Sequence, residues 1–389
     1  MATLEFRTQV VPCEYFTKAH EMFRKEVRAW VKKEVLPYVE EWEEAGGFPR
    51  EMYRKAADAD LLGLCYPEDV GGTSADLFFA LVVTEEWMRS TSAGFAASMG
   101  SMGIALPPIV MHGTPEQKEK YVKPVLRGEK IAALGITEPS GGSDVARIKT
   151  TAVRDGDCYV VNGGKTFITS GIRADQLTTA VRTGGEGHAG ISMLVIDRDT
   201  PGYSTSPPLK KMGWWASDTA EIYFDNCRVP VKNLIGEENQ GFYYIMENFQ
   251  TERLALAVMA NMTSQMALEE SMKYALSREA FGRKLKSFQV IRHKLVDMAT
   301  QLEASREFTY RVASRIAAGE NMVKEISMAK NFACKTADFV TYEAVQIYGG
   351  HGYMRGHVVE RLFRDNRILS IGGGTTEIMK EIISRLMIQ

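Results

Sequence analysis

The chain has 389 residues, which is enough for two or three domains but names no fold by itself. Its Lys+Arg total of 47 against an Asp+Glu total of 49 gives a formal net charge of -2, and neither sign gathers into a long block, so nucleic acid is not expected as a partner. The 5 cysteines are scattered without a C-x-x-C pair, which argues against a zinc site and against a secreted disulfide framework.

The N-terminal segment carries Glu5, Arg7 and Glu14 before any apolar run, unlike a signal peptide or a transit peptide. No uninterrupted apolar stretch approaches the roughly 18 residues that a membrane span requires. The scattered cysteines fit a reducing compartment. We therefore expect a cytoplasmic protein without membrane insertion.

The first third of the chain predicts helices. From Glu14 to about Lys130 apolar residues recur at helical spacing, and loop signals at 46–47, 71–72 and 107–108 leave helices such as 75–88 between them. One helical face is marked by Phe16, His20, Phe23, Val27, Trp30, Val31 and Val35. This pattern indicates an N-terminal helical domain over residues 1–131.

The middle third predicts a compact, barrel-like β domain over residues 132–240. Short β-rich runs at 150–153, 158–161 and 165–169 are separated by Asp155-Gly156 and by Asn162-Gly163, which are strong hairpin signals. Further strands are expected at 176–181, 190–196 and 220–224.

The last third returns to helical periodicity over about 242–278, 288–318 and 322–346, followed by a short helix after Gly374. Long antiparallel helices form bundles, so residues 241–389 are expected to be a C-terminal four-helix bundle. The fold class is α+β, with a helical domain, a β domain and a helical bundle in chain order.

The loop over residues 137–144 gathers hydroxyls and glycines that could grip the polar edge of a flat heterocycle, or that could form an ordinary turn. Gly350-His351-Gly352 with Gly356 misses the G-x-G-x-x-G spacing by one residue and follows a helix. No P-loop motif occurs either, so neither a Rossmann nor a P-loop site is expected.

Glu252 is a lone carboxylate on an apolar helical stripe. Ile245, Phe249, Leu256 and Met259 lie at helical steps from it, and the residues three and four positions away on its own helix include no cation. If it is buried, such a carboxylate has a raised pKa and can act as a base toward a carbon acid. If it lies at a helix end, it faces water. The stripe leaves both interpretations open.

The glycine-rich turn at 372–374 is expected to open a helix that begins near Thr375 and Glu377. Free N–H groups at such a turn suit an anion or a carbonyl oxygen that gains negative charge. Glu86, also on an apolar stripe, is a weaker candidate because it could face solvent. The histidines include no pair with metal-ligand spacing, so no metal is expected.

Several motifs together resemble the acyl-CoA dehydrogenase family over essentially the whole chain. The segments that carry the resemblance are 136–139 with 142–144, 162–165 leading to 167–169, 277–282 followed by Gln289, 346–352, and 374–378. Each is short, but their order along the chain makes the resemblance specific.

This resemblance implies FAD held between the β domain and the C-terminal bundle. The residues implied to meet the flavin ring or its linker are Ile136, Thr137, Gly142, Ser143, Phe167 and Thr169. Those implied to reach the FAD of a neighbouring subunit are Arg278, Phe281, Gln289, Gln346, Ile347, Gly349 and Gly350. Cofactor contacts are also implied at Leu134, Ile168, Phe288, Thr375 and Glu377. The family's usual form is a homotetramer, a dimer of dimers.

Most members of the family carry the catalytic glutamate two residues before the threonine of the last turn, where this chain has Gly373. A minority, including the isovaleryl and long-chain branches, carry it on the long helix immediately before an arginine, which is the place of Glu252 and Arg253 here. The resemblance and the apolar stripe therefore agree on Glu252 as the base. Substrate contacts are implied at Ser143, Arg253, Gly372 and Gly373.

The implied reaction is α,β-dehydrogenation of an acyl-CoA to the trans-2-enoyl-CoA. Glu252 removes the pro-α proton, the β hydrogen leaves as hydride to the flavin, and the Gly373 amide with a flavin ribityl hydroxyl holds the thioester oxygen. Electrons would pass to an electron-transferring flavoprotein. Glycines at 372 and 373 free volume beside Cα, which favours long, branched or alicyclic acyl groups.

Two alternatives stay open. An acyl-CoA oxidase or monooxygenase could use the same scaffold, and a flavin- and acyl-CoA-binding protein without turnover would result if Glu252 pointed away from the flavin. Trp215, where many relatives place arginine, carries no predicted role.

Overall fold

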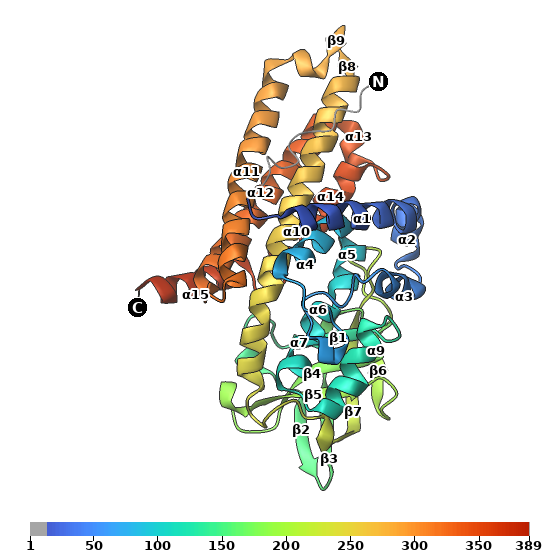
Figure 1. The fold of residues 1–389 in the computed structure, drawn as a ribbon, viewed down its shortest axis with the longest axis vertical. Coiled ribbons are helices and arrows are strands. Elements are labelled where there is room, and N and C mark those ends of the chain that lie inside the picture. The colour runs from blue at the N-terminus through green and yellow to red at the C-terminus, as the bar shows by residue number, and fades with distance from the viewer. Residues whose placement is uncertain (1–13, 389) are drawn as a thin grey trace.

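The computed structural model describes residues 14–388 and has three parts along its long axis (Figure 1). The long helices α10 and α11 run along that axis, with strands β2 and β3 at one end and the β8–β9 hairpin at the other. Of the helices of the first part, α1, α4 and α5 lie beside the middle of α10, whereas α7 and α9 lie lower, near the strands. This arrangement is the α+β architecture expected from the sequence, although the exact domain boundaries stay a prediction.

The first part is helical. Its helices are α1 (Lys18–Glu34), α2 (Val39–Ala45), α3 (Glu51–Asp58), α4 (Leu77–Met88), α5 (Ala93–Gly100), α6 (Met102–Ala105), α7 (Pro107–His112), α8 (Pro115–Gln117) and α9 (Lys123–Leu126). The Thr17 side chain caps α1 by accepting from the His20 N–H, and Asp76 caps α4 by accepting from the Phe78 N–H. These caps fix where both helices begin.

The face predicted for α1 is largely confirmed, since His20, Val27 and Val31 are buried. Arg24 lies on the same buried face, which an apolar pattern could not show. Its guanidinium pairs with Glu85 on α4.

Glu86 on α4 is fully buried at 0% exposure. The expectation that it could face solvent is therefore wrong. It accepts hydrogen bonds from Arg28 Nε at 2.8 Å and from Arg28 Nη2 at 2.7 Å. This bidentate ion pair joins α1 to α4 and gives Glu86 a structural partner.

Residues 93–112, which span α5 to α7, contradict one sequence expectation. Within the described part of the chain, this stretch is long and apolar enough to cross a membrane, with a mean hydropathy of 1.4 over its best window, and 61% of that window is buried inside the fold. Such burial is also what the core helices of a globular protein show.

The second part is a curled sheet of 7 strands. They are β1 (Ala132–Gly135), β2 (Thr151–Asp155), β3 (Cys158–Thr169), β4 (Gln176–Arg182), β5 (Ile191–Asp197), β6 (Tyr203–Thr205) and β7 (Thr219–Pro230). The strand order is β1-β4-β2-β3-β7-β6, with β5 paired to β4. β1 and β4 are parallel, whereas β2–β3, β3–β7, β4–β5 and β6–β7 are antiparallel.

One hairpin prediction is confirmed and the other is wrong. Asp155 pairs with Cys158 across the β2–β3 turn, as expected. At Asn162-Gly163, however, β3 continues without a turn and its register against β7 shifts between Val161 and Gly163. Gly163 has φ +136, and an added Cβ would lie 2.8 Å from Thr150 Cα, so this glycine serves a β-bulge and a close backbone approach.

The third part is built on α10 (Gly241–Ser277), α11 (Gln289–Ala317) and α12 (Val323–Tyr348), with α15 (Thr376–Ile388) at the C-terminal end. Between α10 and α11 the chain makes the hairpin of β8 (Glu279–Ala280) and β9 (Arg283–Lys284). Two short helices, α13 (Gly350–Tyr353) and α14 (Val358–Asn366), were not predicted, because they are too short to show a clear period.

The Arg28–Glu86 pair yields a stability prediction. Glu86→Ala should lower the free energy of unfolding by about 3 kcal/mol, because it breaks an ion pair whose carboxylate is fully buried. Asp58→Ala is the matched control, since its pair with Arg54 on α3 is exposed and should contribute less than about 1 kcal/mol. Urea unfolding measures both, and equal losses would contradict the prediction.

Candidate active site

The structure brings Glu252 on α10 next to the glycine turn at 372–374. A Cβ built on Gly373 would lie 3.5 Å from both the Cδ and the Oε1 atoms of Glu252 and 2.7 Å from Leu256 Cδ1. The space that a side chain at position 373 would need is thus taken by α10. The carboxylate and the turn, which are far apart in the sequence, form one site.

The turn has an unusual backbone. Gly373 has φ +61, in the left-handed region that disfavours other residues. Within the described residues its N–H makes no hydrogen bond, whereas the N–H of Gly372 is bonded to the carbonyl of Ile368 at 2.8 Å. Helix α15 then begins at Thr376, and the Thr375 hydroxyl accepts from the N–H of Ile378. A free amide therefore lies beside the carboxylate.

Two cationic side chains meet the carbonyl side of the turn. Lys330 on α12 donates to the Gly372 carbonyl at 2.5 Å and also to the Gly374 carbonyl. Arg253, adjacent to Glu252 on α10, makes a longer contact of 3.5 Å from its Nε to the Gly373 carbonyl. Both side chains are buried.

Burial raises the pKa of the Glu252 carboxyl above its ordinary value, while the charges of Lys330 and Arg253 oppose that rise. Across residues 14–388 Glu252 makes no hydrogen bond or ion pair. The expectation that no cation lies near it holds only for the i±3 and i±4 neighbours on its own helix, because Lys330 comes from α12. A partly exposed carboxylate of this kind can still accept a proton from a ligand.

The apolar stripe around Glu252 is confirmed. Ile245, Leu256 and Met259 are buried, and Phe249 is half-buried. Their side chains reduce the water around the carboxylate, which is the physical cause of its raised pKa.

A first group of predicted cofactor positions comes together in the β domain. Thr166 N donates to the Thr137 carbonyl at 2.8 Å, and Lys165 Nζ donates to the Ile136 carbonyl at 3.3 Å. These bonds hold the loop after β1 against β3. A Cβ added to Gly142 would lie 3.2 Å from Thr137 Cγ2, so the Thr137 side chain packs closely against this glycine.

Phe167 lies at this junction with φ +59 and a side chain that is 70% exposed. A left-handed backbone is costly for an aromatic residue and persists only where the surroundings enforce it. Leu134 and Thr169 are half-buried and Ser143 is exposed, whereas Ile168 is buried in the core. An aromatic ring is thus kept out of the core and open to a flat ligand.

A second group lies elsewhere. Arg278 directly follows the end of α10, and Gln289 starts α11. Phe281 in the β8–β9 hairpin is 94% exposed, and its ring centroid lies 6.2 Å from that of Phe288. This hairpin is at the opposite end of the molecule from β2 and β3 (Figure 1). The positions at the end of α12 and the start of α13 are Gln346, Ile347, Gly349 and Gly350. The β8–β9 hairpin lies away from the β domain within one chain.

Thr375 and Glu377 lie at the start of α15, and Glu377 is exposed. Their placement next to the glycine turn puts them at the site, but their contact with a cofactor stays a prediction.

Sequence reasoning did not single out Lys330, because the turn that it contacts is far away along the chain. The signal that could have found it is a lysine at a position that otherwise reads as core: it is flanked on α12 by the buried Ile326, Ala333, Cys334 and Ala337. Trp215 had no predicted role. Its ring centroid lies 3.6 Å from the Cζ atom of Arg364 and 4.2 Å from that of Arg355. Its Nε1 donates a hydrogen bond to the Lys211 carbonyl. It therefore joins the β domain to the region of α14.

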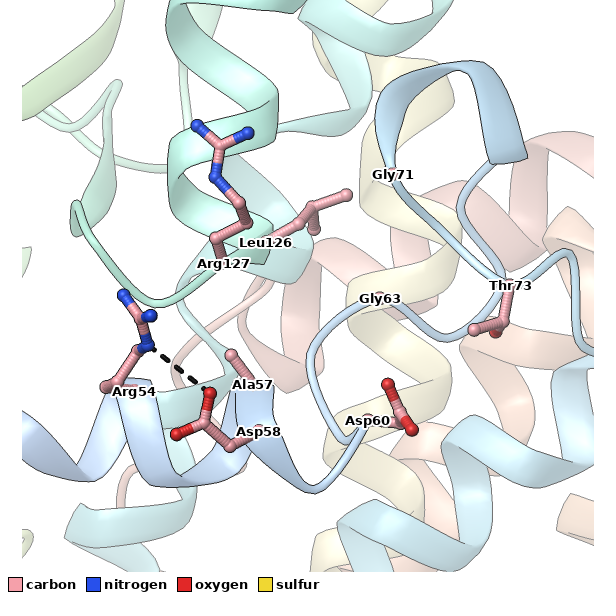
Figure 2. Close-up of a pocket in the computed structure, with 9 residues that line it drawn as sticks. All are labelled: Arg54, Ala57, Asp58, Asp60, Gly63, Gly71, Thr73, Leu126 and Arg127. Carbon is pink, nitrogen blue, oxygen red and sulfur yellow. Dashed lines mark hydrogen bonds and ion pairs between the residues drawn. The ribbon is translucent and has the colours of Figure 1, made fainter.

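A surface pocket of about 280 Å³ lies apart from this site, between α3, the following loop and the end of α9 (Figure 2). Its arginines are already paired, Arg54 with Asp58 and Arg127 with Glu129. None of the predicted site residues lines it. No group of three or more potential metal ligands occurs in the described part of the chain.

Comparison with known proteins agrees with the fold. The models for the N-terminal, middle and C-terminal domains of acyl-CoA dehydrogenases match residues 17–129, 133–227 and 239–388. A solved structure of a probable acyl-CoA dehydrogenase from Mycobacterium abscessus is 49% identical, with a TM-score of 0.94, and the match covers 96% of this chain and 100% of that one.

Two curated relatives show the same likeness. An acyl-CoA dehydrogenase of Bacillus subtilis is 38% identical over 375 residues, covering 96% of this chain and 99% of the relative. The mitochondrial long-chain specific acyl-CoA dehydrogenase of Rattus norvegicus is 37% identical over 376 residues, covering 96% of this chain and 87% of the relative. The chain therefore belongs to the acyl-CoA dehydrogenase family, and it is an oxidoreductase that acts on an acyl-CoA thioester.

Enzymes of this family use FAD, and a solved relative from Bacillus anthracis is complexed with it. The residues of this chain fit such a cofactor, because the exposed Phe167 ring and the close-packed loop at Thr137 and Gly142 offer a flat surface with backbone groups beside it. A further relative, from Acetobacterium woodii, is named as a subunit of a caffeyl-CoA reductase-Etf complex.

The contrast between Gly373 and Gly372 can be tested directly. Gly373→Ala should destabilise the protein by about 1–2 kcal/mol through its left-handed backbone, with a further cost from the contact with Leu256. Gly372→Ala is the control, because its added Cβ would meet only the Ile368 carbonyl at 3.6 Å. The melting temperature measures the difference, and similar values for the two variants would refute it.

Proposed function

We propose that Glu252 is the base that removes the α proton of the bound acyl-CoA, and that the N–H of Gly373 holds the thioester oxygen. The observation that carries this proposal is the 3.5 Å approach of the Glu252 carboxylate to the Cβ position of Gly373, next to an amide that makes no other hydrogen bond within the described residues. A base and an oxyanion donor are the two groups that carbon-acid chemistry requires.

When bound, FAD would supply the acceptor for the β hydrogen, which leaves as hydride. The protein residues act at Cα, the other carbon of the Cα–Cβ bond. Glu252 takes the α proton onto a carboxylate oxygen, and the Gly373 amide stabilises the charge that grows on the thioester oxygen, a contribution of about 3 kcal/mol for one such donor. The product is the trans-2-enoyl-CoA.

The first group of cofactor positions, from Ile136 to Ser143 with Phe167 to Thr169, is proposed to hold the flavin ring of the same subunit. The β8–β9 group, with Arg278, Phe281 and Gln289, is proposed to reach the FAD of a neighbouring subunit, because within one chain it lies at the opposite end from β2 and β3. This arrangement would require an oligomer, and the family resemblance implies a homotetramer.

The substrate is proposed to carry a long, branched or alicyclic acyl group. The open space beside Gly372, where an added Cβ would meet only the Ile368 carbonyl at 3.6 Å, supports this, as does the similarity to a long-chain specific enzyme. The volume expected to be free at Gly373 is instead taken by Leu256 and Glu252. The electron acceptor is proposed to be an electron-transferring flavoprotein, supported by the relative named with Etf.

Glu252→Gln tests the base. The amide keeps the shape of the side chain but cannot accept the proton, so flavin reduction by any acyl-CoA should fall at least about 1,000-fold while FAD stays bound. Glu247→Gln is the matched control, because Glu247 lies on the exposed face of the same helix and pairs with His112 at 3.2 Å. Retained flavin reduction in Glu252→Gln would remove the assignment.

Anaerobic reduction of the holoenzyme by a panel of acyl-CoA thioesters tests the substrate and the reaction class. Bleaching of the flavin should be fastest with long, branched or alicyclic acyl groups, since the turn is open beside Gly372. The reduced enzyme should form little peroxide in air and should pass electrons to an electron-transferring flavoprotein. Activity confined to butyryl-CoA would contradict the substrate proposal, and rapid peroxide formation would favour an oxidase.

A further inference from the structure

Lys330 is a buried cation without a carboxylate partner. It is 1% exposed, and within the described residues its hydrogen bonds go only to the carbonyls of Gly372 and Gly374. Lys165, the other deeply buried lysine, pairs with Glu138 at 2.7 Å in the usual way. Burying an ammonium group is costly, so its position at two backbone oxygens calls for a reason.

The geometry of the peptide bond between Gly372 and Gly373 explains the position of Lys330. The carbonyl of Gly372 and the N–H of Gly373 belong to one planar peptide, which is trans, so they point in opposite directions. A cation that fixes the carbonyl oxygen therefore also fixes where the N–H points. It draws electron density toward the oxygen, which makes the N–H a stronger donor.

We propose that Lys330 is a positioning residue for the reaction: its ammonium group holds and polarises the peptide between Gly372 and Gly373, so that the Gly373 amide meets the negative charge developing on the thioester oxygen. This inference rests on the proposed function. Lys330 touches no reacting atom and acts through the peptide and through its charge.

The charge of Lys330 also bears on Glu252. The titratable groups that face Lys330 are Glu252 and Arg253 on α10 and Cys334 on its own helix. Lys330 and Arg253 both hold the pKa of Glu252 below the value that burial alone would give it. Removing the Lys330 charge should therefore raise that pKa further.

The test compares holoenzymes carrying Lys330→Met, Lys330→Gln or Asn331→Ala. Met keeps the length and loses both the charge and the hydrogen bonds, whereas Gln keeps a neutral donor. Asn331→Ala is the matched control, because Asn331 also ties α12 to the C-terminal segment, donating to the Thr376 carbonyl at 3.1 Å, outside the glycine turn.

Lys330→Met should lower kcat about 100-fold, as expected for a weakened oxyanion donor, and change KM less than about threefold. Lys330→Gln should lie between Lys330→Met and the unmodified enzyme, and Asn331→Ala should keep kcat. The acidic limb of the pH–rate profile should move to higher pH in Lys330→Met, because a base with a raised pKa is deprotonated only at higher pH.

A 3-thia-acyl-CoA gives a readout that a merely structural role would not move. Sulfur replaces Cβ, so this analogue can lose its α proton but has no β hydrogen to transfer. Its enolate is detected by a long-wavelength absorbance band in the holoenzyme. Half-formation of that band should need a higher pH in Lys330→Met than in Asn331→Ala.

The outcomes distinguish the role of Lys330 from the proposed role of Glu252. Unchanged kcat and an unchanged enolate titration in Lys330→Met would overturn the role of Lys330 even if Glu252→Gln is inactive. An active Glu252→Gln would instead overturn the proposed function. If Lys330→Met loses FAD, the Lys330→Gln holoenzyme tests the role of Lys330 instead. A normal kcat and a normal enolate titration in that variant would refute the inference. A lowered kcat and a shifted enolate titration would support it.

Discussion

The site depends on one constraint, which is that a carboxylate, three backbone carbonyls and two cations share a small space where α10, α12 and residues 372–374 meet. Glu252 brings the negative charge, while Lys330 and Arg253 bring the positive charges. Neither cation forms an ion pair with the carboxylate, since Lys330 is bonded to the turn and Arg253 lies 3.5 Å from the Gly373 carbonyl. The carboxylate is thus kept unpaired, and its pKa stays raised despite the nearby charges.

The glycine at 373 is part of the same constraint. Its backbone is left-handed and Leu256 fills the place of a Cβ, so a glutamate at this position would need both the strain and a displaced α10 side chain. The two placements of the base that the resemblance implies, at 252 and at 373, are therefore alternatives in space, because α10 side chains occupy the volume that a side chain at 373 would need.

The rest of the fold serves to bring these elements together. The buried Arg28–Glu86 pair joins α1 to α4, and Trp215 joins the β domain to the region of α14 through two arginines. The curled sheet holds Phe167 in a strained backbone with its ring open. Rigid supports of this kind matter because an oxyanion donor and a base act only within a narrow range of positions.

Much of this could be predicted from the sequence, because hydrophobic periodicity is local. The helical and β segments and the stripe around Glu252 were predicted, as was the absence of a side chain at 373. The sequence prediction was wrong where one local signal fits two structures. Asn162-Gly163 predicts a hairpin, but these residues form a β-bulge. Only the packing of Gly163 against Thr150 distinguishes the two. Glu86 read as a possible surface residue, because its partner Arg28 lies on another helix.

The sequence by itself determined the family, the element types and the candidate base. Only the tertiary structure decided which charges surround that base and that Lys330 grips the turn, because these contacts join helices that are far apart along the chain and share no pattern.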